Sequence, residues 1–148
     1  MIITRSITIA RPAADVWEYL TDPEKVEQWQ VSAVEIRKES EGPMNVGSKL
    51  TDVRKFLGRR MELEMEVTEF EPERRFAIRA ASGPFPFESR QTLSAADGST
   101  TVDVTLEGNP GGFFKLAAPL VQHRAERQLE TDLETLKDLL EARAGAPQ

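Results

Sequence analysis

The chain has 148 residues, of which 39% are hydrophobic and 30% charged, and its formal net charge is -6. This length suits one domain spanning residues 1–148, and the negative charge argues against nucleic acid or an anionic membrane as partner, because both attract clustered cations. The sequence has no cysteine, which excludes disulfides, thiolate nucleophiles and cysteine metal sites. No apolar run approaches the roughly 20 residues that cross a bilayer, and no cationic leader precedes one, so we expect a cytoplasmic protein without a membrane span.

A strand and two short helices are predicted at the start of the chain. Residues 2–9 alternate isoleucines with threonine and serine, the period of two expected of a strand with one buried face. Arg5 interrupts the apolar parity, and we expect it to reach water rather than the core, because buried arginine is rare. Pro12 suits the first turn of a helix, and Asp22 can cap a second helix that ends near Trp29.

Six further strands fit the segment that follows. The clearest covers residues 61–67, where methionine, leucine and valine alternate with glutamate, so one face is core and the other faces water. Turn signals separate the strands at residues 41–43, 57–58, 71–73, 82–84 and 97–98. Consecutive strands joined by short turns favour an antiparallel meander with one dry face.

A long helix is predicted over residues 112–144. In its second half four leucines recur at spacings of four, three and four residues and form one narrow face, and charged residues, Asp132 among them, take the remainder. Pro119 predicts a kink or a fresh helix start. Residues 144–148 are expected to form a frayed tail.

The order of elements resembles that of a known superfamily. The residues that carry the resemblance are ITIARPAADVWEYLTDPEKVEQW at 7–29, VGSKL at 46–50, GRRMELEMEVTEFEPERRFAI at 58–78 and the terminal LETDLETLKDLLE. They resemble the helix-grip superfamily, which includes START lipid-transfer domains, birch-pollen-allergen-like proteins and the bacterial polyketide cyclase/dehydrase-like (SRPBCC) branch.

This resemblance implies an α+β helix-grip fold. In that fold a curved antiparallel seven-stranded sheet has two short helices after its first strand and a long C-terminal helix packed across it. The resemblance also implies a deep cavity between the sheet and the helix for an apolar ligand, and no cofactor. A fold of this breadth does not decide the function.

We expect flexible thioethers and large rings to line such a cavity. On the strand at 87–93, Ser89 and Gln91 share the parity of the apolar residues. They therefore point inward, or they point into water if the strand is twisted or lies at an edge. A filled core built from the same side chains is the alternative to a cavity. The predicted ligand-binding set is Trp29, Met61, Met65, Phe85, Phe87, Ser89, Gln91, Phe113, Leu116, Leu120 and His123.

No catalytic or metal-binding motif stands out in the sequence. His123 is the only histidine, and histidine is the residue type most often used for acid-base catalysis, which makes it the formal candidate for that role, yet its place at a helix margin is typical of a boundary residue. Gly111-Gly112 lacks the pattern of a phosphate loop. We therefore assign no catalytic residue and no metal ligand.

The sequence predicts a small soluble protein that holds a hydrophobic ligand, such as a lipid, a polyketide or an aromatic metabolite, between the sheet and the C-terminal helix. A polyketide cyclase/dehydrase-type enzyme is the first alternative. A protein-interaction module without a ligand is the second.

Overall fold

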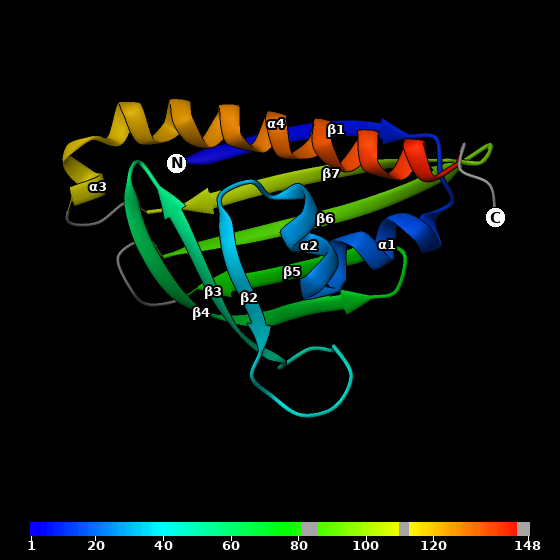
Figure 1. The fold of residues 1–148 in the computed structure, drawn as a ribbon, viewed down its shortest axis with the longest axis horizontal. Coiled ribbons are helices and arrows are strands. Elements are labelled where there is room, and N and C mark those ends of the chain that lie inside the picture. Colours follow the sequence, from blue (N-terminus) through cyan, green and yellow to red (C-terminus); the bar gives the residue numbers. More distant parts are fainter. Residues whose placement is uncertain (81–85, 110–112, 145–148) are drawn as a thin grey trace.

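One antiparallel sheet and one long helix dominate the structure, a computed structural model that describes residues 1–80, 86–109 and 113–144. The elements are β1 (Ile2–Ile9), α1 (Ala13–Thr21), α2 (Pro23–Trp29), β2 (Ala33–Lys38), β3 (Lys49–Phe56), β4 (Arg59–Glu71), β5 (Arg75–Ala80), β6 (Phe87–Ala96), β7 (Ser99–Gly108), α3 (Phe113–Leu116) and α4 (Ala118–Ala144). The seven strands lie in the order β1-β7-β6-β5-β4-β3-β2. The predicted α+β arrangement, with two short helices after β1 and a long C-terminal helix, is confirmed (Figure 1).

Two tight hairpins fix the register of the sheet. Leu57 and Gly58 join β3 to β4 with φ of 51° and 75°, and Asp97 and Gly98 join β6 to β7 with φ of 53° and 79°. Two-residue loops with positive φ at both positions are type I′ turns, whose twist matches that of the strands they connect. Both turns lie where the sequence predicted them.

The longest strand, β4, sets the curvature of the sheet. Met61, Leu63, Met65 and Val67 are buried, while the glutamates between them are exposed or half-buried. The pairing of β4 with β5 shifts register between Val67 and Glu69, and such a bulge bends a strand and increases its twist. The sheet accordingly curls around the helices in Figure 1.

The C-terminal helix α4 starts at Ala118, directly before Pro119, and runs along β1 (Figure 1). The predicted fresh helix start is thus confirmed. Arg5 of β1 is 34% exposed in its side chain and pairs with Glu130 at 3.1 Å and with Glu126 at 3.5 Å, both on α4. It therefore ties the strand to the helix at the margin of the core.

Candidate functional site

A cavity of about 190 Å³ lies between the sheet and the helices α2 and α4. Residues of β2 to β7 line one side of it, and residues of α1, α2 and α4 line the opposite side. Its wall is mostly apolar and includes Leu50, Met61, Leu63, Met65, Phe76, Phe87, Val104, Leu129 and Leu133. A concave, largely apolar space with a few polar groups is the usual form of a small-molecule site.

Six of the residues predicted from the sequence lie in this wall. They are Trp29, Met61, Met65, Phe87, Ser89 and Gln91. The indole of Trp29 is fixed because Nε1 donates a 2.8 Å hydrogen bond to the carbonyl oxygen of Tyr19. Ser89 and Gln91 are only 6% and 7% exposed, so the inward of the two alternatives holds for both. That these residues contact a ligand stays a prediction.

Three predicted residues do not line the cavity, and the structure corrects that expectation. Leu116 is 91% exposed, Leu120 is 53% exposed, and His123 is exposed as well. At this end of α4 the inward position belongs to Val121, which is fully buried. At about 100° per residue, Leu120 and His123 are turned at least 100° away from Val121. Phe85 and the side chain of Phe113 lie outside the described residues.

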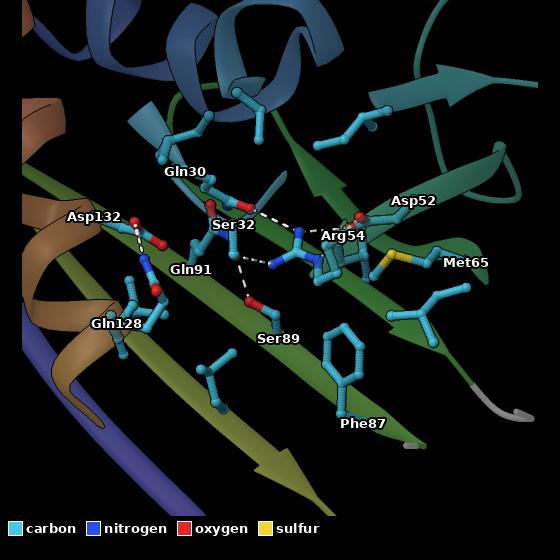
Figure 2. A pocket seen from close by; sticks show the side chains of 18 of the residues that line it. Gln30, Ser32, Asp52, Arg54, Met65, Phe87, Ser89, Gln91, Gln128 and Asp132 are labelled. Carbon is cyan, nitrogen blue, oxygen red and sulfur yellow. Dashed lines mark hydrogen bonds and ion pairs between the residues drawn. The ribbon is translucent and has the colours of Figure 1, made fainter. Parts of the chain in front are cut away.

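An ion pair on β3 forms one polar side of the cavity. Arg54 donates from Nε to Oδ1 of Asp52 at 2.9 Å and from Nη2 to Oδ2 at 2.6 Å (Figure 2). The same Nη2 donates to Oε1 of Gln30 at 2.8 Å, and Nη1 lies 3.5 Å from Oγ of Ser32. Asp52 is 3% exposed, so this bidentate pair is largely withdrawn from water.

Asp132 of α4 supplies a second buried carboxylate. It is 5% exposed, and its Oδ1 accepts a hydrogen bond from Nε2 of Gln128 at 2.8 Å (Figure 2) and another from the backbone N–H of Val31 at 3.3 Å. Burial raises the pKa of Asp132 to about 6, although these hydrogen bonds and the charge of Arg54 oppose the rise. The carboxyl group of Asp132 can thus gain or lose its charge as the pH passes through about 6.

Asp52, Arg54 and Asp132 were not predicted as site residues from the sequence, although a signal for them was present. Asp52 and Arg54 share the strand parity of Leu50, which is buried, and thus face the same side. Asp132 was expected on the polar side of the helix, which is incorrect. It stands three residues after Leu129 and belongs to the buried stripe, because residues three and four apart share a helix face.

Some kinds of site are not found in the part of the chain that the structure describes. Within it no group of three histidine, cysteine, aspartate or glutamate side chains is placed to hold a metal ion. No helix among the described residues is long and apolar enough to cross a membrane.

Comparisons with known proteins agree with this architecture. A family model described as polyketide cyclase / dehydrase and lipid transport matches residues 1–141. No curated protein sequence matches the chain.

Solved structures show the same fold at low identity. The chain resembles a protein of Thermus thermophilus (TM-score 0.83, 19% identity, covering 99% of this chain and 100% of that one). It also resembles the Zhui aromatase/cyclase of a Streptomyces species (TM-score 0.82, 18% identity, 99% and 96% covered) and a START superfamily protein of Mycobacterium smegmatis (TM-score 0.81, 17% identity, 95% and 97% covered). At such identity these likenesses establish the helix-grip fold alone.

Proposed function

The chain belongs to the polyketide cyclase / dehydrase and lipid transport family, and on that premise we propose that it binds a small hydrophobic molecule in the cavity between the sheet and α4. The observation that carries the proposal is the cavity itself, an apolar space with buried polar groups on β3, β6 and α4. A core that served stability alone would be filled, because protein interiors pack as densely as organic crystals. The apolar wall supplies affinity, and the polar groups orient the ligand.

The volume of the cavity limits the size of the ligand. About 190 Å³ is slightly more than the roughly 150 Å³ of an engineered apolar cavity that binds benzene, and less than the roughly 300–1,000 Å³ of pockets for drug-sized ligands. The space thus suits one or two rings or a short chain. A full-length lipid or polyketide extends through the opening or requires the walls to move apart.

The direct test combines identification with competition. Native mass spectrometry of the purified protein detects a co-purified molecule, and its organic extract shows whether that molecule is apolar. In parallel, the protein is titrated with a neutral solvatochromic dye, and we expect saturable binding with a blue-shifted emission as the dye leaves water.

A matched pair of variants tests whether the dye binds inside the cavity. Ala125 lines the cavity, whereas Ala118 on the same helix is outside the cavity wall. We expect Ala125→Phe to fill the space and weaken dye binding by about tenfold or more, and Ala118→Phe to leave it unchanged. Thermal melts confirm that both variants fold. Equal binding to both variants, or no saturable binding to the unaltered protein, would refute the proposal.

The buried carboxylate favours an enzyme as the second candidate function. A carboxyl group whose pKa is raised to about 6 inside a cavity is suited to proton transfer near neutral pH, and it lies within the electrostatic reach of Arg54. Under this reading the chain is a polyketide cyclase/dehydrase-type enzyme, and Asp132→Asn abolishes turnover of a polyketide substrate while ligand binding survives. Turnover that survives this change would exclude Asp132 as the acid-base group. The interaction module and the cytoplasmic location stay predictions from the sequence.

A further inference from the structure

The amide of Gln91 is the least satisfied polar group in the cavity wall. Its side chain is 93% buried, as its 7% exposure shows, and its Oε1 has no hydrogen-bond partner among the described residues. Its Nε2 donates only a long bond of 3.4 Å to Oγ of Ser89, the neighbouring inward residue of β6 (Figure 2). Buried polar groups in native proteins are almost always paired, so an open partner position at a cavity wall points to a ligand.

We propose that the ligand is a neutral, mostly apolar molecule that carries a hydroxyl group, and that this hydroxyl pairs with the amide of Gln91. The inference rests on the proposed function, because it names the class of molecule that the same cavity holds. Gln91 selects the hydroxyl, and contact with the apolar wall supplies the remaining affinity.

A hydroxyl suits this position better than a carbonyl group. As the amide stands, Oε1 needs a donor. A half-turn of the amide would let Oε1 accept from the hydroxyl of Ser89 and leave Nε2 in need of an acceptor. A hydroxyl group both donates and accepts, and so it satisfies Gln91 in either orientation. A ketone or an ester only accepts, and so it satisfies Gln91 only after the half-turn, when Nε2 needs an acceptor.

The charges around the cavity disfavour an anionic ligand such as a carboxylate. Arg54 is the one cationic side chain in the wall among the described residues, and its bidentate bond to Asp52 already neutralises it. Asp132 adds a further buried carboxylate to the wall, and the amino group of Met1 donates to the carbonyl oxygen of Gly108 at 3.2 Å. A ligand carboxylate beside Arg54 would thus meet a guanidinium that is already paired, with the second buried carboxylate of Asp132 in the same wall.

The experiment uses three bicyclic probes that differ at one position: 2-naphthol, naphthalene and 2-naphthoate. Each is titrated against the full chain at neutral pH, by calorimetry or by displacement of the neutral dye. We expect 2-naphthol to bind about three- to tenfold more tightly than naphthalene, which is the range for one net hydrogen bond, and 2-naphthoate to bind most weakly.

A matched pair of variants then tests the role of Gln91. Gln91→Met removes the amide while keeping the length of the side chain, and we expect it to abolish the preference for 2-naphthol over naphthalene while naphthalene still binds. The same change at Gln122, a half-buried residue of α4 outside the cavity wall, should keep the preference. Thermal melts of both variants report whether they fold.

The outcomes separate this inference from the proposed function. If none of the probes binds saturably, the cavity is not a binding site and the proposed function fails. If naphthalene or 2-naphthoate binds as tightly as 2-naphthol, or if Gln91→Met keeps the preference, the cavity binds apolar molecules but the hydroxyl inference is overturned, as it would be if a buried water satisfied the amide. The ranking of probes on the unaltered protein decides the matter even if Gln91→Met does not fold.

Discussion

The two ends of the space between sheet and helices are built differently. At one end Val16, Leu136 and Leu140 are at most 1% exposed and pack in one cluster without contributing to the cavity wall. At the other end Met65 and Phe87 border a cavity of about 190 Å³ that also holds an ion pair. These three side chains at the first end are branched aliphatics, whereas the wall of the second end adds thioethers, rings and buried polar groups to its aliphatic residues.

The leucine stripe of α4 crosses from one end to the other. All four leucines belong to one buried cluster, but Leu129 and Leu133 also line the cavity, whereas Leu136 and Leu140, further along the helix, do not. The same residue type at the same helical spacing therefore serves as wall in one place and as filling in the next. Stability and ligand binding are expected to divide along this helix, because function is commonly located in the less densely packed part of a fold.

The largest effect is expected in the filled end. Leu136→Ala should lower the free energy of unfolding by about 3–5 kcal/mol, because Leu136 is 0% exposed and deleting a packed leucine leaves a void that the neighbours close only partly. Chemical denaturation measures the change. Glu134→Ala on the exposed side of the same turn is the control and should stay within about 0.5 kcal/mol. A loss below about 1 kcal/mol for Leu136→Ala would show that this end is not tightly packed.

The cavity wall should tolerate the same truncation better. Leu133→Ala is expected to cost about 2–3 kcal/mol, less than Leu136→Ala, because the atoms removed already border open space and lose fewer packing contacts. Saturating 2-naphthol in the denaturation experiment should recover part of this loss, since a ligand stabilises the folded state that binds it. It should recover a smaller share for Leu136→Ala. Equal losses and equal recovery in the two variants would remove the distinction between the two ends.

The filled end was predicted more completely than the hollow end, because sequence patterns report contacts between residues that are close along the chain. The filled end was predictable, because period-two strands and the leucine stripe around Leu136 report burial through their immediate neighbours. The hollow end was predictable only in part: strand parity placed Met65 in its wall, but the pairing of Arg54 with Gln30 joins residues 24 positions apart, and no local pattern reports such a partner. Spacing places Val121 nearer the leucine stripe than Leu120, but it does not reveal that Leu120, on the opposite face, meets water rather than a second apolar surface.

The buried carboxylate of the hollow end should make stability depend on pH. Burial raises the pKa of Asp132 to about 6, above the roughly 3.9 of an unfolded chain, so the folded state binds the proton more tightly. This contribution to stability is complete below about pH 4 and is lost as the pH rises through about 6. Asp132→Asn keeps an acceptor for Gln128 and Val31 and removes the buried charge.

We expect Asp132→Asn to stabilise the protein by about 1–3 kcal/mol at neutral pH, the size that a shift of about two pKa units allows, and to have a much smaller effect near pH 4. Denaturant unfolding of both proteins across this range measures the difference. Destabilisation by the variant at neutral pH would mean that the carboxylate stays charged and that its interactions stabilise the fold by more than its desolvation destabilises it.

The smallest effects are expected where α3 and α4 meet, an end that the sequence placed in the site and the structure places in water. Leu116→Gln and Leu120→Gln should each change stability by less than about 0.5 kcal/mol and leave the affinity for 2-naphthol unaltered, because these side chains are 91% and 53% exposed. The same change at Leu129, which is 8% exposed and lies in the cavity wall, buries an unpaired amide and should cost about 1–3 kcal/mol. If Leu116→Gln or Leu120→Gln weakened 2-naphthol binding at unchanged stability, this exposed end would form part of the ligand's path into the cavity.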